Sequence, residues 1–129
     1  MKICIVIANY YPKISNNLLE GATKVLKKNG IKNYKKILVP GIFEIPIAIA
    51  KNIKKYDGFI ALGCVIKGET PHFEFISSAT TNAIMELSIS YKKPISNGII
   101  TCLNMNQAIV RSKTKGQEAA KAVLSVINL

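Results

Sequence analysis

Short apolar runs alternate along this chain with longer segments in which apolar residues recur every three or four positions. The short runs are rich in isoleucine and valine, and they predict buried strands at residues 3–8, 36–39, 59–65 and 95–102. The helical spacing predicts helices at residues 15–28, 44–54 and 71–91, a short helix at 105–110 and a last one at 117–128.

Strands that alternate with helices in this way are typical of a parallel sheet covered on both faces. We therefore predict an α/β fold with three αβα layers: a flavodoxin-like four-stranded parallel sheet with helices on both faces, in one domain over residues 1–129. Such a sheet binds its ligands beyond the carboxyl ends of the strands. That edge comprises residues 9–11, 41–44, 66–72 and 103–104, where we expect the functional side chains.

The amino-acid composition excludes several classes of protein. Hydrophobic residues make up 49% of the chain, which excludes a disordered protein. The apolar runs at residues 3–8 and 45–50 are too short for a secretory signal or a membrane span, so we expect a cytoplasmic protein with no membrane partner. The three cysteines are odd in number and lack CxxC spacing, so neither a disulfide framework nor a metal site is indicated.

The formal net charge is +11, which invites comparison with nucleic-acid-binding proteins. Of the 18 basic residues, however, Arg111 is the single arginine. Base readout depends on arginine forks and non-specific binding on clustered basic faces, and neither is evident in the sequence. We therefore expect the charge to attract anionic small substrates, with no nucleic acid as a partner.

The only histidine, His72, falls at the start of the helix that follows the third strand. Thr70 suits the N-cap position of that helix and Pro71 its first turn. Free N–H groups at a helix start bind anions such as phosphate, and Gly68 would let a ligand approach the backbone closely. A proton-transferring histidine beside an anion site and a solvated first-turn histidine after a plain turn fit the position equally well.

Three further groups could take part in chemistry. Glu44 begins the second helix, either as a favourable charge at the helix start or as an acceptor for substrate hydroxyls beside the wall of Phe43. Tyr10 and Tyr11 follow the first strand and could stack on a planar ring or simply pack. Arg111 lies off the ligand edge, where a phosphate contact and a surface position are both open.

A nucleophilic cysteine is the less favoured reading. Cys64 and His72 could form a nucleophile and its base. Cys64 ends an apolar strand, however, and the sequence places no charge beside it that would lower the pKa of its thiol. The simplest interpretation is that all three cysteines are small buried side chains without a chemical role.

Together these segments resemble the lumazine synthase family. Four segments carry the resemblance. Val39 to Pro46 match the family's VPGxFEIP run, and Ala61 to Phe73 contain its LGCVIRGETPHF run with Lys67 in place of arginine. The other two are Leu18 to Ala22 in the first helix and the QAIVR segment from Gln107 to Arg111. The resemblance extends from Ile3 to the C-terminus, and the segment around His72 is highly specific.

The resemblance implies a reaction. The family condenses 5-amino-6-(D-ribitylamino)uracil with 3,4-dihydroxy-2-butanone 4-phosphate to give 6,7-dimethyl-8-ribityllumazine, the penultimate step of riboflavin biosynthesis. Phosphate and water are released, and neither a metal nor an organic cofactor takes part. Without the resemblance, the same chain reads as a non-catalytic flavodoxin-like binding module or as a basic nucleic-acid-associated protein. A phosphoacceptor module would need acidic residues after the first strand, where this chain has Asn9.

The resemblance also implies roles for individual residues. His72 would transfer protons, and Tyr10 would stack on the pyrimidine. The residues expected to hold the ribityl chain are Ile42, Phe43 and Glu44, with Glu44 accepting hydrogen bonds from its hydroxyls. The residues expected to meet the pyrimidine edge through their backbone are Cys64, Val65 and Ile66.

On the phosphate side, Glu69 and Thr70 would present backbone N–H groups and Arg111 would pair with the anion. In the family this arginine and the residue at the position of Asn97 come from a neighbouring subunit. The resemblance thus implies active sites shared between the subunits of a homo-oligomer, a pentameric ring.

The chain departs from the family pattern in three places. It starts at the first parallel strand, without the N-terminal extension that reaches a neighbouring subunit. Asn97 stands where the family commonly has a large apolar residue. After Thr114 the usual Lys-Ala-Gly-Asn stretch is missing, so that Lys115 and Gly116 follow directly. Because that stretch shapes the bend between the last two helices, we expect a homopentamer rather than an icosahedral shell.

Overall fold

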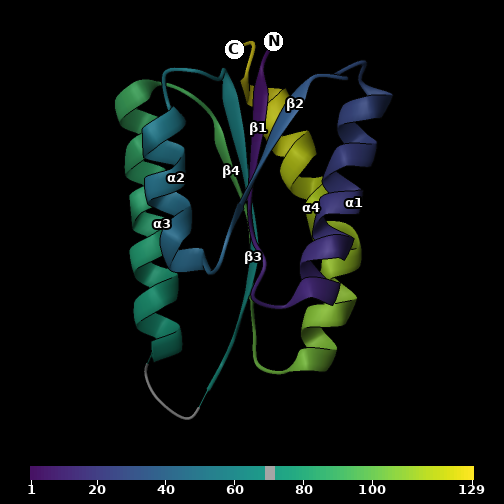
Figure 1. Cartoon of the computed structure of the whole chain (residues 1–129), viewed down its shortest axis with the longest axis vertical. Helices are drawn as coiled ribbons and strands as arrows, with labels where there is room; N and C mark the ends of the chain where they lie inside the picture. Colours follow the sequence, from purple (N-terminus) through teal and green to yellow (C-terminus); the bar gives the residue numbers. More distant parts are fainter. Residues whose placement is uncertain (69–71) are drawn as a thin grey trace.

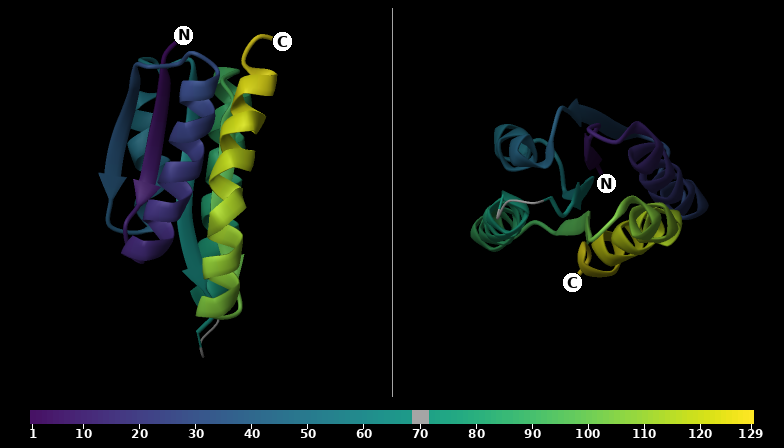
Figure 2. Two further views of the ribbon diagram at one scale, coloured as in Figure 1. Left: turned by 90° about the vertical axis from the view of Figure 1, so that its right-hand side faces the viewer. Right: turned by 90° about the horizontal axis from the view of Figure 1, so that it is seen from below.

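The computed structural model describes residues 1–68 and 72–129. In chain order, the elements are β1 (Ile3–Ala8), α1 (Pro12–Lys28), β2 (Tyr34–Val39), the 3₁₀ helix η1 (Ile42–Glu44), α2 (Ile45–Asn52), β3 (Gly58–Ile66), α3 (His72–Tyr91), β4 (Ile95–Cys102) and α4 (Met105–Val126). The strands pair in parallel in the order β2-β1-β3-β4. Helices α2 and α3 cover one face of the sheet and α1 and α4 the other (Figures 1 and 2). The predicted α/β fold is confirmed.

Alternate residues of the central strands form the two layers of the core. In β1, Ile3, Ile5 and Ile7 belong to the cluster under α1 and α4, whereas Cys4 and Val6 belong to the cluster under α2 and α3. Every residue of β1 is buried, because a parallel strand in the middle of a two-sided sheet has no solvent face. This explains why the strand appears in the sequence as an unbroken apolar run.

The C-terminal helix differs from the prediction. We expected separate helices at residues 105–110 and 117–128, but α4 is continuous from Met105 to Val126. Gly116 interrupts the apolar pattern without interrupting the helix. A Cβ atom at Gly116 would lie 2.0 Å from the carbonyl oxygen of Leu18, so this glycine lets α4 approach α1 closely. Nearby, Asn17 donates a hydrogen bond of 3.1 Å from Nδ2 to Oγ of Ser112 across the same interface.

The other boundaries shift by a few residues. Helix α1 begins at Pro12 rather than Ser15, with proline in its first turn, and β2 begins at Tyr34 rather than Lys36. Glu44 ends η1, so α2 begins one residue later than predicted, and it ends at Asn52. The predicted start of the long helix at Pro71 lies outside the described residues.

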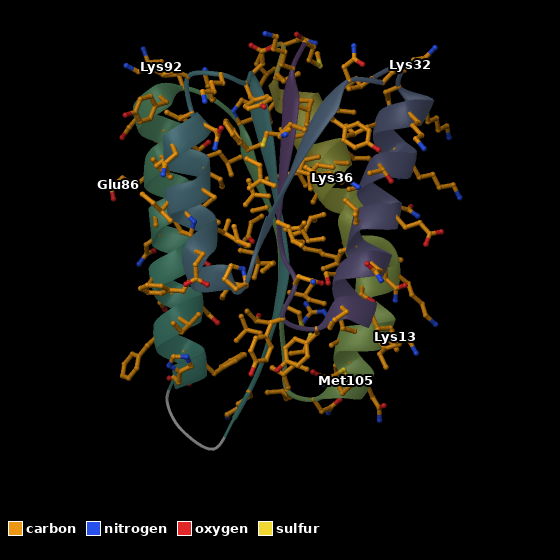
Figure 3. All side chains as sticks on the ribbon, in the orientation of Figure 1. Lys13, Lys32, Lys36, Glu86, Lys92 and Met105 are labelled. Carbon is orange, nitrogen blue, oxygen red and sulfur yellow. The ribbon has the colours of Figure 1, made fainter. Side chains whose placement is uncertain are left out.

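The helices expose different kinds of side chain. Lys13, Lys32 and Lys36 lie on the side of α1 and β2 (Figure 3). Helix α3 contains no lysine or arginine, and it exposes Phe75, Met85 and Ile89 by 67%, 58% and 68%. Across the two described segments of the chain, no helix combines the length and the apolar character needed to cross a membrane.

We predict that Gly116→Ala destabilises the protein. The added methyl group gains up to ~1 kcal/mol of helix propensity, but it has to push the Leu18 backbone away from α4. Overpacking of this kind commonly costs about 1–3 kcal/mol, so we expect a net loss in the free energy of unfolding in urea. Gly68→Ala is the control, since no atom of the described residues beyond its chain neighbours lies within 4 Å of the added Cβ. Equal stability of the two variants would contradict the close approach.

Candidate functional site

A cleft of about 500 Å³ lies at the carboxyl ends of β1, β2 and β3, at the lower end of the molecule in Figure 1. Its wall consists of three chain segments and the first turn of α3. The lining residues are Tyr10, Tyr11, Pro40, Gly41, Ile42, Phe43, Glu44, Cys64, Val65, Ile66, Gly68, His72, Phe73 and Ile76. The ligand edge predicted from the alternation of strands and helices is therefore the edge that is hollowed.

One side of the cleft is the end of β3, which extends beyond its neighbour β1. The pairing of β1 with β3 ends at Ile7 and Leu62, whereas the pairing of β3 with β4 continues to Ile66 and Cys102. Within the described part of the sheet, Cys64, Val65 and Ile66 pair with β4 only, so their backbone is open on the side of β1. Backbone N–H and C=O groups in that position need partners, and these groups line the cleft.

The segment after β2 forms the opposite wall. Ile42 is buried and packs toward Gly63, where a Cβ atom would lie 2.9 Å from Cγ2 of Ile42. This contact fixes η1 against β3, and the N–H of Glu44 donates to the carbonyl of Gly41 at 3.2 Å. Phe43 is 64% exposed and lines the cleft beside the carboxylate of Glu44. An aromatic wall and an anionic acceptor thus stand next to each other.

An aromatic pair follows β1. The backbone N–H of Asn9 donates to the carbonyl of Val39 at 3.0 Å, and Oγ of Ser15 donates to Oδ1 of Asn9 at 3.1 Å. These bonds fix the turn that carries Tyr10 and Tyr11. The two rings meet edge to face, with centroids 4.9 Å apart and an angle of 74° between their planes. Both tyrosines were candidates for stacking on a planar ring, and both line the cleft, although the family resemblance implied a role for Tyr10 alone.

His72 is the first described residue of α3, and its side chain is exposed where it lines the cleft. The imidazole is thus brought to the same hollow as the aromatic pair and Glu44. Glu69 and Thr70, the residues predicted to bind phosphate through their N–H groups, lie outside the described residues. Within residues 1–68 and 72–129, no group of three or more His, Cys, Asp or Glu side chains is placed to hold a metal ion.

The thiol of Cys64 is a poor nucleophile. Burial, together with the neighbouring Cys102, raises the pKa of Cys64 from its ordinary value of 9.0 to about 12. The group is therefore a neutral thiol at pH 7, and only a thiolate attacks efficiently. This agrees with the sequence-based preference against a Cys64–His72 pair.

Arg111 is held near the end of β4. Its Nη1 donates to the carbonyl of Thr101 at 2.9 Å, and Thr101 is paired with Val65 at the end of the sheet. This contact forms because α4 starts directly after β4 and its second turn folds back over the strand end. Arg111 nevertheless lines a separate hollow with Asn106, Gln107 and Val110, not the cleft of its own chain.

Asn97 is also outside the cleft. It is the third residue of β4, is paired with Ala61, and accepts a hydrogen bond of 3.0 Å at Oδ1 from the N–H of Ile99. The structure therefore brings together Tyr10, Ile42, Phe43, Glu44, Cys64, Val65, Ile66 and His72. It leaves Asn97 and Arg111 on other surfaces of the same chain.

Comparison with known proteins bears directly on this site. The model of the 6,7-dimethyl-8-ribityllumazine synthase family matches residues 1–129. The chain belongs to this family. It is 46% identical over 135 residues to the 6,7-dimethyl-8-ribityllumazine synthase of Bartonella bacilliformis, an alignment that covers 98% of this chain and 88% of the relative. The enzyme of Agrobacterium fabrum is 44% identical, with 98% and 93% covered. That of Renibacterium salmoninarum is 36% identical, with 96% and 86% covered.

Several residues that line the cleft of this lumazine synthase family member were given no role in the sequence analysis. They are Pro40, Gly41, Phe73 and Ile76. Phe73 follows His72 directly, and Ile76 lies one turn further along α3, so helical spacing from His72 would have found Ile76. The other residues are neighbours in the chain of predicted ones, and their side chains or backbone complete the same walls.

We predict that the native protein resists alkylation at its buried thiols. The pKa of Cys4 is raised by burial from 9.0 to about 11 and that of Cys64 to about 12. Below the pKa, each unit by which the pKa of a thiol rises removes about nine-tenths of the remaining thiolate. At pH 8, iodoacetamide should therefore react about 100-fold more slowly at Cys4 and about 1000-fold more slowly at Cys64 than in the unfolded chain. Peptide mass spectrometry measures both rates. Fast reaction at Cys64 that disappears in His72→Ala would instead indicate an activated thiolate.

Proposed function

We propose that this chain catalyses the condensation of 5-amino-6-(D-ribitylamino)uracil with 3,4-dihydroxy-2-butanone 4-phosphate to 6,7-dimethyl-8-ribityllumazine, a step of riboflavin biosynthesis. The observation that carries the proposal is the cleft itself. The described parts of the segments that match the family, within residues 39–46, 61–68 and 72–73, meet there around one imidazole, one carboxylate and an aromatic pair. Membership of the family disfavours a non-catalytic binding module or a nucleic-acid-associated protein.

The pyrimidine is assigned to the side of the cleft between β1 and the end of β3. Tyr10 stacks on the ring, and the open backbone at Cys64, Val65 and Ile66 binds its edge. This assignment is supported by the end of the pairing between β1 and β3 at Leu62, which leaves these backbone groups open toward the cleft. Backbone hydrogen bonds along a planar edge fix both the position and the orientation of the ring.

The ribityl chain is assigned to the wall formed by Ile42, Phe43 and Glu44. Glu44 accepts hydrogen bonds from its hydroxyls, because an ionised carboxylate accepts at both oxygens. The position of Glu44 between η1 and α2 supports this role: among the described residues, its carboxylate makes no capping hydrogen bond to the start of α2. Its acceptor capacity is therefore available to a ligand.

The proposed chemistry requires proton transfer, positioning and stabilisation of an anion. The amine of the pyrimidine substrate attacks the carbonyl carbon of the butanone phosphate, and water and phosphate leave as the second ring forms. His72 transfers the protons of these steps: it takes a proton from the attacking amine, gives one to the carbinol oxygen before water leaves, and moves protons at the carbon atoms of the butanone chain. Glu69, Thr70 and Arg111 bind the phosphate, with Arg111 as the bidentate partner.

We further propose that the active unit is a homopentamer in which Arg111 and Asn97 serve the cleft of a neighbouring subunit. Two observations support an assembly: Arg111 lines a hollow apart from the cleft of its own chain, and α3 exposes a stripe that contains Phe75, Met85 and Ile89 without a single lysine or arginine. An exposed apolar helix face in a monomer marks an interaction surface. A ring closed by rotation buries that face in every subunit.

A pentamer without a closed shell is part of the same proposal. Most of the lysines belong to α1, α4 and the segment around β2, where Glu20 and Glu118 are the only acidic residues of these elements. Like charges on the surfaces left outside the ring disfavour further contacts between pentamers. The three buried free thiols suit the reducing conditions of the cytoplasm, which we propose as the location.

We predict that His72→Ala folds like the wild type but lowers the rate of lumazine formation by about 10²–10⁴, the usual effect of losing a general acid–base group. The measurement follows the fluorescence of the product and the release of phosphate from both substrates. Lys24→Ala, an exposed position on α1 away from the cleft and from the exposed face of α3, is the control and should keep the wild-type rate. Full activity of His72→Ala would remove the imidazole from the mechanism.

We predict that Arg111→Ala raises the KM for the butanone phosphate and leaves the KM for the pyrimidine unchanged, because the guanidinium binds only the phosphate. Lys113→Ala removes an exposed cation of the same helix and should change neither constant. Mixing Arg111→Ala with His72→Ala subunits then tests the sharing of sites. In a randomly mixed ring about one site in four combines an intact His72 with an intact Arg111, so activity should return. No recovery after demonstrated subunit exchange, or a monomeric mass in sedimentation, would contradict the shared site.

A further inference from the structure

The stacking ring of the proposed site has little support of its own. Tyr10 is 71% exposed, and its side chain turns about two single bonds. Among the described aromatic residues, Tyr11 is the one whose ring meets it, at 4.9 Å between centroids and 74° between planes. The orientation of Tyr10 therefore depends on Tyr11.

Tyr11 itself is firmly held. Its ring is half-buried and packs against the core cluster under α1 and α4. Its carbonyl accepts two hydrogen bonds from Ser15, one from the backbone N–H at 2.9 Å and one from Oγ at 3.0 Å. Burial, followed by Tyr10 and Cys64, raises the pKa of the Tyr11 phenol. Tyr10, Tyr11 and Cys64 line the same cleft.

An edge-to-face contact suits the support of a stacking platform. Aromatic rings attract each other in this arrangement beyond what their buried area alone provides. Tyr10 lines the cleft and remains 71% exposed despite this contact, so Tyr11 leaves most of the ring uncovered. A ring that is already oriented loses less freedom when a ligand stacks on it, so the ligand binds more tightly.

We propose that Tyr11 is a positioning residue, which holds the ring of Tyr10 in the orientation that stacks on the pyrimidine substrate. The inference rests on the proposed function, since that function assigns the pyrimidine to Tyr10. Tyr11 lines the same cleft but acts through Tyr10 rather than through a contact of its own with the reacting atoms. The required group is the aromatic ring and not the hydroxyl.

The test compares Tyr11→Phe with Tyr11→Leu. Phenylalanine keeps the ring edge, whereas leucine fills the core contact without offering an aromatic ring. Steady-state kinetics gives the KM for each substrate and kcat, and calorimetry with 5-amino-6-(D-ribitylamino)uracil alone gives a dissociation constant without turnover. We expect Tyr11→Leu to raise the KM and the dissociation constant of the pyrimidine by about 3- to 10-fold, with kcat and the KM of the butanone phosphate unchanged. Tyr11→Phe should match the wild type.

Three results would overturn the role of Tyr11 while leaving the proposed function intact. Wild-type affinity in Tyr11→Leu would show that Tyr10 needs no support. An equal loss in Tyr11→Phe and Tyr11→Leu would show that the hydroxyl contacts the ligand directly. A parallel loss in kcat and in both KM values, with a lower melting temperature, would show a structural role. By contrast, a wild-type protein that neither binds the pyrimidine nor forms lumazine overturns the proposed function and this role with it.

Discussion

Strand β3 pairs with its two neighbours over different lengths, and this difference determines where the cleft lies. β3 is paired with β1 only as far as Leu62 but with β4 as far as Ile66. The cleft begins where β1 stops, because the chain turns away there toward Tyr10 and leaves one side of β3 open. The contact of Ile42 with Gly63 then brings the segment after β2 to the same place. The cleft thus lies at the sheet edge, between the carboxyl ends of β1, β2 and β3.

Much of this arrangement is visible in the sequence. The strands are unbroken apolar runs because both faces of the sheet are covered, and their carboxyl ends must share one edge because all four are parallel. These two facts were enough to select the segments around Tyr10, Glu44 and His72. The close match of residues 39–46 and 61–73 to one family then narrowed the chemistry further.

What the sequence does not reveal are contacts between elements that are distant in the chain. Gly116 looked like a helix end, since glycine has low helix propensity, but its lack of a side chain is needed where α4 meets Leu18 of α1. The hydrogen bond of Arg111 to the carbonyl of Thr101 depends on how α4 folds back over β4. The proposed support of Tyr10 by Tyr11 depends on the relative orientation of the two rings, which the pattern of apolar residues does not predict.

The open end of β3 has a consequence for sequence change. A ligand held there by main-chain N–H and C=O groups is recognised by atoms that every amino acid except proline supplies in full. The side chains of Cys64, Val65 and Ile66 then serve mainly to pack the end of β3 in place, and several small or medium-sized apolar residues would do the same. If the proposed site is correct, recognition at this edge tolerates mutation, whereas the proton transfer assigned to His72 depends on one imidazole, the only one in the chain.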